Sequence, residues 1–151
     1  MKKIIIIVLS LILLTSCTKT EISSSEFVEV ATFNGYIITS SMDGYEKYDY
    51  INNVIYAINR ENAYFIQFIE INNDDYAKKF FDINKQEIEK NKTNNSYVKK
   101  INKSDYGLYH IENDDDYQLV MRIRNNIIYI DAPINYINEI EEFLNELNID
   151  Y

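Results

Sequence analysis

Two segments of the chain show the same order of structural patterns, and this order restricts the fold more than any other feature. Residues Val54 to Lys90 and Tyr117 to Leu147 each read as strand, turn, strand and helix. Two short strands joined by a tight turn form an antiparallel hairpin, and an amphipathic helix after it covers one face. Residue identity between the segments is slight, so the ββα pseudo-repeat is a repeat of secondary-structure order and not of sequence. We expect an α+β two-layer sandwich, with helices packed on one face of an antiparallel sheet.

The first segment contains the clearest hairpin. Val54 to Asn59 and Ala63 to Ile71 read as strands, and Arg60-Glu61-Asn62 reads as their turn. The second strand is apolar on both faces, which predicts a central position in the sheet. The helix that follows extends to about Lys90, with apolar residues at helical spacing. These residues are Tyr76, Ala77, Phe80, Phe81 and Ile88.

Other elements flank these segments. Ser23 and Glu26 have the spacing of a capping box, and Asn34-Gly35 is typical of a helix end. A strand from Tyr36 to Thr39 follows this first helix. The other predicted strands are Tyr97 to Ile101, Gly107 to Glu112, Tyr117 to Arg124 and Ile127 to Asp131. A closing helix is expected from about Asn135 to Leu147, with its apolar stripe at helical spacing.

The first sixteen residues are predicted to be a signal peptide. Lys2 and Lys3 precede an apolar run that ends in the sequence Leu14-Thr15-Ser16-Cys17. The apolar run is about 11 residues long, whereas a membrane-spanning helix needs about 20, so cleavage is favoured over a transmembrane anchor. Cys17 is the only cysteine in the chain, so a disulfide within the chain is excluded. A buried core thiol is disfavoured by its position at the cleavage site.

The sequence Leu14-Thr15-Ser16-Cys17 resembles the lipobox of bacterial lipoproteins. This resemblance implies cleavage before Cys17, diacylglycerol on its thiol and anchoring at the extracytoplasmic face of the cell membrane. The two acyl chains of one diacylglycerol are sufficient for stable anchoring. The predicted organisation is therefore a signal peptide (1–16), a lipidated cysteine with a short tether (17–22) and a single α+β domain (23–151).

Charge restricts the partners. Lys2 and Lys3 belong to the signal peptide, so the remaining chain has 13 Lys and Arg against 24 Asp and Glu, a formal charge of −11. An acidic domain repels nucleic acids and anionic lipid headgroups. We therefore expect no nucleic-acid partner, and we expect contact with the bilayer through the diacylglycerol on Cys17 and not through a basic patch.

Four tyrosines are the candidate ligand-binding residues. Tyr45, Tyr48 and Tyr50 lie in a polar loop from Ser40 to Asn53, and Tyr56 lies in the next strand. Exposed aromatic side chains are enriched at interfaces, where they stack on sugars or peptides. The alternative is that these tyrosines reflect codon bias and ordinary half-burial, because Asn, Ile, Lys and Tyr are all abundant.

No pattern of catalytic or metal-binding residues stands out. His110 is the only histidine, and we expect it to be a half-exposed strand residue and not a catalytic one. The Gly-x-Ser-x-Gly context of a serine hydrolase is absent from the sequence. Asp114-Asp115-Asp116 offers carboxylates for Ca²⁺, but it lacks the spacing of an EF-hand and is more typical of a solvated hairpin turn. We expect no cofactor and no metal, and we expect the protein not to be an enzyme.

The chain resembles small lipoproteins of low-GC Gram-positive bacteria. The matching features are the lipobox, the helix end Phe33-Asn34-Gly35-Tyr36, the helix around Ala77 to Phe81 and the end Leu147 to Tyr151. The resemblance implies the membrane location and the α+β fold, and it assigns no site residue. We expect a non-enzymatic binding or interaction domain for an envelope protein, a peptide or a small ligand. The alternative is an accessory or structural subunit of a membrane complex or transporter, and an extracytoplasmic hydrolase is the least favoured.

Overall fold

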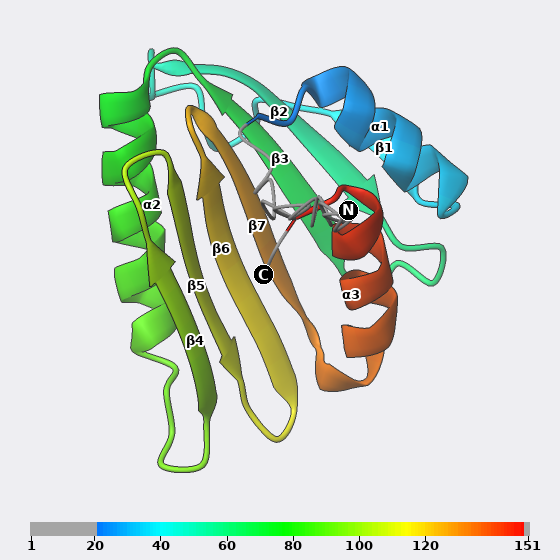
Figure 1. The fold of residues 1–151 in the computed structure, drawn as a ribbon. Coiled ribbons are helices and arrows are strands. Elements are labelled where there is room, and N and C mark those ends of the chain that lie inside the picture. Colours follow the sequence, from blue (N-terminus) through cyan, green and yellow to red (C-terminus); the bar gives the residue numbers. More distant parts are fainter. Residues whose placement is uncertain (1–20, 150–151) are drawn as a thin grey trace, which may run out of the picture.

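The fold is known from a computed structural model, which describes residues 21–149. Seven antiparallel strands form one sheet in the order β1-β2-β3-β7-β6-β5-β4 (Figure 1). The strands are β1 (Ile37–Ser40), β2 (Ile51–Ile58), β3 (Phe65–Ile71), β4 (Tyr97–Asn102), β5 (Tyr106–Glu112), β6 (Asp116–Ile123) and β7 (Asn126–Pro133). The helices are α1 (Ser24–Phe33), α2 (Asp74–Glu89), the short 3₁₀ helix η1 (Ile134–Tyr136) and α3 (Ile137–Glu146). The predictions for the signal peptide and Cys17 lie outside the described residues.

Local sequence signals account for the ends of the first two long helices. The Ser23 side chain accepts a hydrogen bond from the Glu26 amide at 3.2 Å, so Ser23 caps α1 as predicted. Gly35 follows α1 with a φ of +80°, a conformation that glycine adopts without steric strain. The Asn73 side chain caps α2 in the same way, through the Tyr76 amide at 3.0 Å.

Both predicted hairpins are present in the sheet. β2 pairs with β3, and β6 pairs with β7. The two hairpins join through β3 and β7, where Gln67 lies opposite Tyr129. β3 therefore has a neighbour on each side, as its two apolar faces predict. No helix among the described residues is long and apolar enough to cross a bilayer.

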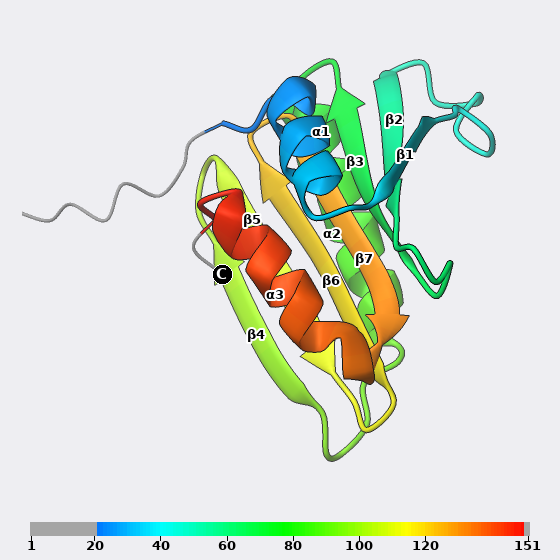
Figure 2. The ribbon, with the colours of Figure 1, turned by 90° about the vertical axis from the view of Figure 1, so that its right-hand side faces the viewer.

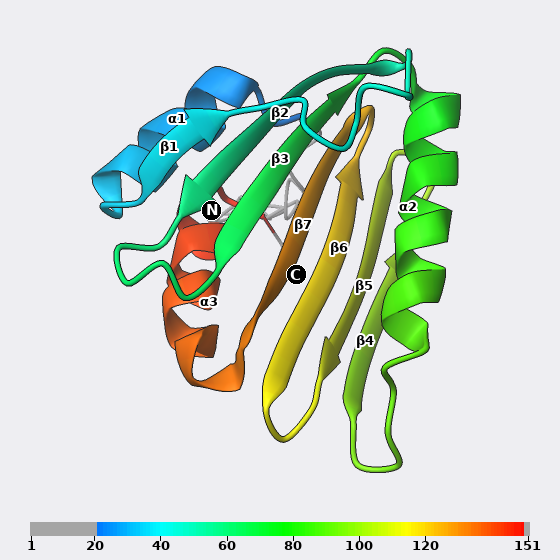
Figure 3. The same cartoon turned by 180° about the vertical axis from the view of Figure 1, so that it is seen from behind.

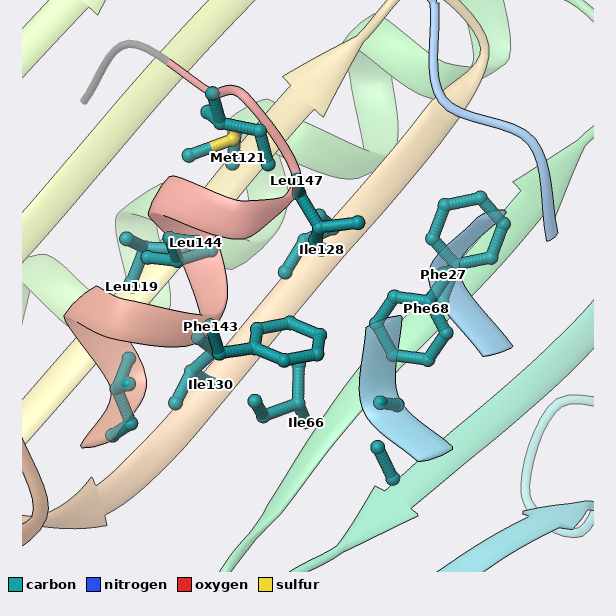
Figure 4. Packing of buried hydrophobic residues seen from close by; sticks show 14 of the residues in the cluster. Phe27, Ile66, Phe68, Leu119, Met121, Ile128, Ile130, Phe143, Leu144 and Leu147 are labelled. Atoms are coloured by element: carbon teal, nitrogen blue, oxygen red, sulfur yellow. The ribbon is translucent and has the colours of Figure 1, made fainter. Parts of the chain in front are cut away.

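One face of the sheet is closed by α1 and α3, and together they form the predicted two-layer sandwich (Figure 2). Phe27 of α1 stacks on Phe68 of β3, with ring centroids 5.0 Å apart, and meets the edge of Phe143 from α3 at 5.6 Å (Figure 4). All three phenylalanines are completely buried. This face therefore carries the main apolar core of the domain.

Helix α2 packs on the opposite face of the sheet, over a second apolar cluster (Figure 3). The α+β class, the antiparallel sheet and the packing of helices against it are confirmed. The expectation that the helices share one face holds for α1 and α3 but needs correction for α2. The reason is the alternation of β3, in which Ile66 and Phe68 face α1 whereas Ile69 and Ile71 contribute to the cluster under α2. Both faces of β3 are apolar, so each requires a cover.

Candidate functional site

A polar pocket of about 290 Å³ opens at one end of the sheet, where three chain segments meet. The connection from α1 to β1 contributes Phe33, Asn34, Gly35 and Tyr36, the β2–β3 turn contributes Asn59, Arg60 and Glu61, and η1 and α3 contribute Tyr136 and Glu139. We call this the end pocket. Its volume is at the lower limit of ligand sites in proteins and suits a small ligand.

The β2–β3 turn holds Arg60 and Glu61 in a defined position. The buried Asn59 side chain accepts a hydrogen bond from the Ala63 amide at 2.9 Å, and the Asn59 carbonyl accepts one from the Asn62 amide at 2.8 Å. Asn62 has a φ of +56°, which asparagine tolerates better than most residues. The turn is therefore closed by its own hydrogen bonds, and its two charged side chains line the end pocket.

Gly35 provides the surface on which Arg60 lies. The Arg60 Nε donates a hydrogen bond to the Gly35 carbonyl at 2.8 Å. A Cβ added to Gly35 would lie only 2.5 Å from a terminal nitrogen of Arg60. Within residues 21–149, no carboxylate forms an ion pair with Arg60. The terminal N–H groups of this guanidinium therefore remain available for an anionic group of a ligand.

A chain of hydrogen bonds forms the inner wall of the end pocket. The Tyr64 hydroxyl donates to Glu139 Oε1 at 2.8 Å. Each hydroxyl has one proton, so the 2.6 Å bond between the two tyrosine hydroxyls is donated by Tyr36 to Tyr64. Tyr36 and Tyr64 are only 6% and 4% exposed, whereas Glu139 lies at the surface. This series of hydrogen bonds therefore connects the buried Tyr36 hydroxyl with the exposed Glu139 carboxylate.

Burial keeps the two tyrosines protonated. It raises the pKa of Tyr36 and Tyr64 well above the ordinary value near 10, and the negative charge of Glu139 raises both further. The hydroxyls are neutral at physiological pH for this reason. They act as hydrogen-bonding groups, and neither serves as a base.

The rim of the end pocket combines aromatic and acidic side chains. Phe33 is 82% exposed, a large solvent-facing apolar area for a residue at the end of a helix. The Tyr136 hydroxyl donates a hydrogen bond to Glu61, which raises the Tyr136 pKa. The end pocket thus places one guanidinium and two carboxylates beside two aromatic rings. This combination suits a small molecule that has an ammonium group, a carboxylate and an apolar side chain.

The four predicted tyrosines form one cluster on the α2 side of the sheet. Tyr45 and Tyr48 have ring centroids 6.5 Å apart, and Tyr48 and Tyr50 have theirs 5.5 Å apart. Tyr45 donates a hydrogen bond to Gln67 at 3.1 Å, and Gln67 lies opposite Tyr56 in the sheet. Burial raises the pKa of Tyr45, Tyr50 and Tyr56.

This tyrosine cluster serves as packing. Tyr48 meets the ring of Phe80 at 6.5 Å, and Tyr50 stacks on Tyr76 with ring centroids 4.7 Å apart. Both partner rings belong to α2. The loop between β1 and β2 therefore folds onto the sheet beside α2, and the end pocket is lined by other residues. A ligand-binding role for the four tyrosines stays a prediction.

His110 lies in the core of the α1–α3 side, and its predicted half-exposure is wrong. It is 3% exposed, and its Nε2 is 2.7 Å from Glu112 Oε1. Nδ1 has no hydrogen-bond partner among the described residues. Burial lowers the His110 pKa, and the bond to Glu112 offsets part of this change. Inward alternation along β5 explains the burial.

Asp114, Asp115 and Asp116 lie at the β5–β6 turn, as predicted, and line a shallow pocket with Asn91, Thr93 and Asn113. Within residues 21–149, no group of three or more His, Cys, Asp or Glu side chains has a geometry that could hold a metal ion. The three aspartate side chains are exposed, so the turn is an acidic part of the surface.

Sequence reasoning missed the end pocket because its residues are dispersed over about a hundred positions. Arg60 and Glu61 were interpreted only as turn residues, and Glu139 as part of a helix. Two signals were present in the sequence. Arg60 is one of only three arginines in the chain. Phe33 directly precedes the predicted helix end Asn34-Gly35, a position at which an apolar side chain is commonly exposed.

Comparison with family models, with curated proteins and with solved structures finds no match to this chain.

Proposed function

We propose that this protein is a lipid-anchored extracytoplasmic binding domain that holds a small amino-acid-like ligand in the end pocket. The single observation that carries this proposal is that Arg60 lines the end pocket together with two glutamates. Its guanidinium has free N–H groups for a carboxylate, while Glu61 and Glu139 attract an ammonium group. Phe33 and Tyr136 offer aromatic surface to the ligand side chain.

Anchoring through Cys17 would leave the end pocket accessible. The Asn126 side chain donates a hydrogen bond to the Ile22 carbonyl at 2.7 Å, so the tether joins the domain at the start of β7. Tyr136 follows the end of β7, and a strand of this length spans about 26 Å. A domain anchored by Cys17 would therefore present the end pocket on the side away from the bilayer, open to the medium.

Several features support binding over catalysis. The tyrosine pair stays protonated, and each pocket glutamate already accepts a hydrogen bond from a tyrosine hydroxyl. Acid–base catalysis by two carboxylates uses groups in contrasting surroundings, and these surroundings are similar. His110 is on β5, away from the segments that form the pocket.

An accessory subunit of a membrane complex is the second candidate, favoured by an exposed apolar row. Ile37, Ile58 and Phe65 lie opposite one another on β1, β2 and β3, and Ile37 and Phe65 are 58% and 43% exposed. Such a row suits contact with another protein. If this is the function, Phe65→Asp will abolish co-purification of a stoichiometric membrane partner, while Arg60→Gln will not.

Amide NMR spectra of the domain titrated with the twenty L-amino acids and a set of dipeptides test the proposal. We expect at least one compound to shift the signals of Gly35, Arg60 and Glu139 together. Shifts confined to the loop of Tyr45 and Tyr48 would move the ligand site to the tyrosine cluster. No shift at millimolar concentration from any compound would reject the ligand class.

The anchor is tested separately by mass spectrometry of the protein isolated from membranes. The mass should correspond to a chain that begins at Cys17 and carries diacylglycerol. Cys17→Ala should release the protein from the membrane fraction. An unprocessed chain, or an unmodified Cys17, would contradict the lipoprotein assignment without affecting the end pocket.

A further inference from the structure

Positive charge is concentrated in one part of this acidic chain. Residues 78–103 contain eight lysines against Asp82, Glu87 and Glu89, so this segment is positive by five charges while the whole chain is −9. The segment forms most of α2, the connection after it and β4. These elements lie together at one side of the sheet (Figure 3). The net charge of the whole chain therefore does not describe this segment.

A groove runs between α2 and the edge strand β4. Two hollows of about 240 and 340 Å³ share Lys85 of α2 and Lys100 of β4, so they form one continuous depression. The first hollow extends to Lys92, and the second begins at Phe81. Within α2 the lining extends from Phe81 to Glu89, which is about 12 Å at 1.5 Å per residue. We call this depression the lysine groove.

The lysines of this groove lack carboxylate partners. In the described part of the chain, Lys85, Lys92 and Lys100 form no ion pair, although acidic residues outnumber basic ones overall. The Lys85 ammonium lies 5.5 Å from the centre of the Tyr109 ring. Two carboxylates also line the groove: Glu89, which is hydrogen-bonded to Tyr109, and Asp82. The lining therefore has three lysines against two carboxylates, and an anionic ligand would gain from the three ammonium groups that form no ion pair.

We infer that the lysine groove binds a linear polyanion that carries phosphate groups along its length. Lysine ammonium groups bind phosphate as point charges, and a row of them suits a chain of phosphates. The groove is concave and runs along β4 from Asn102 toward Val98. A flat bilayer surface fits this shape poorly.

The floor of the groove distinguishes this ligand from nucleic acid. Tyr109 is 2% exposed and lies beneath Lys85, so its ring is unavailable for stacking on a base. Proteins that bind single-stranded nucleic acid rely on exposed aromatic rings for much of their affinity. Among its described lining residues, the lysine groove offers ammonium groups and no exposed aromatic platform, which favours a polymer with phosphate groups and no bases.

Fluorescence anisotropy with labelled inorganic polyphosphate tests this inference on the full-length protein in neutral detergent. The groove variant is Lys85→Gln/Lys100→Gln. The control is Lys47→Gln/Lys79→Gln, which removes the same charge from lysines that also lie over tyrosine rings. We expect the groove variant to bind about tenfold more weakly and with a reduced salt dependence, because fewer counterions are released. The control should change affinity by less than about twofold.

Equal losses in the two variants would show unspecific attraction and overturn the inference. Tighter binding to single-stranded oligothymidylate, to orthophosphate or to vesicles of anionic phospholipid than to polyphosphate would also overturn it. Equal melting temperatures of the two variants will establish that the groove variant is folded. This experiment is independent of the end pocket, because Arg60 and Glu139 are unchanged in both variants.

Discussion

The two faces of the sheet are covered in different ways. On the α1–α3 side, two helices cover a cluster of 23 buried residues in the described part of the chain, with stacked phenylalanines at its centre. On the α2 side, one helix and a tyrosine-rich loop cover a smaller cluster of 12. The first face is an apolar core, whereas the second includes half-buried tyrosines and the lysine groove. The first face therefore stabilises the fold, while the second face and the sheet ends remain available for binding.

The largest expected effect comes from the core of the α1–α3 side. Phe143→Ala removes a completely buried ring that contacts Phe27 and Tyr36, and should lower the free energy of unfolding by about 3–5 kcal/mol. Phe80→Ala on the α2 side should lower it less, because the tyrosine loop can close on the space. Urea denaturation measures both values. Equal losses would contradict the proposed difference between the faces.

A smaller effect is expected at two glycines with nearly the same backbone conformation. Gly35 and Gly44 have φ values of +80° and +84°, so alanine at either position should cost about 1–2 kcal/mol. Only Gly35 has a close neighbour, because Arg60 lies against it, whereas nothing lies within 4 Å of a Cβ at Gly44. Gly35→Ala should therefore also displace Arg60 and weaken ligand binding. If Gly44→Ala weakens binding equally, Arg60 is not the determinant.

Tyr36→Phe should lower stability at neutral pH by about 1 kcal/mol, because one hydrogen bond to Tyr64 is lost. It should also change the alkaline behaviour. A folded-state pKa raised above 10 gives stability that is complete below pH 10 and is lost as the pH rises through the folded-state value. The variant should lose less stability above pH 10 than the natural chain. Tyr97→Phe, at an exposed position, is the control and should leave the alkaline profile unchanged.

The smallest effect concerns His110 and acid. Its folded-state pKa is lowered by burial, so its contribution to stability is complete above pH 6.5 and is lost as the pH falls through the lowered value. Lys99 lowers this pKa further, while Glu112 and Glu141 oppose the change. His110→Gln should flatten the decline in melting temperature below pH 6.5. A profile parallel to that of the natural chain would show that His110 is not the sensitive group.

Much of the fold could be predicted from local signals. The Ser23 cap, the Asn34-Gly35 helix end and the apolar alternation of β3 each depend on residues close in the sequence. The placement of α2 could not, because the face that a helix covers depends on strands that pair across the whole domain. The same limit applies to charge, since the lysine groove appears only when β4 lies beside α2.

The candidate site was harder to predict than the fold. Tyr45, Tyr48 and Tyr50 are close in sequence and suggested a binding cluster, but they pack on Phe80 and Tyr76. Tyr64 and Glu139 are hydrogen-bonded although 75 positions separate them, and no sequence pattern joins them. Long-range pairing of polar residues gives no periodic signal, which is why the end pocket required the structure.

The central claim is that the end pocket binds an amine through its carboxylates. The most direct measurement is the affinity of the best amino acid or dipeptide, by calorimetry, for Glu139→Gln and for Glu142→Gln. Both substitutions remove one negative charge from the exposed side of α3, but only Glu139 lines the pocket. We predict a loss of about tenfold or more for Glu139→Gln, because a charge-assisted hydrogen bond to the ammonium group is lost, and less than about twofold for Glu142→Gln. Equal affinities in the two variants would contradict the account.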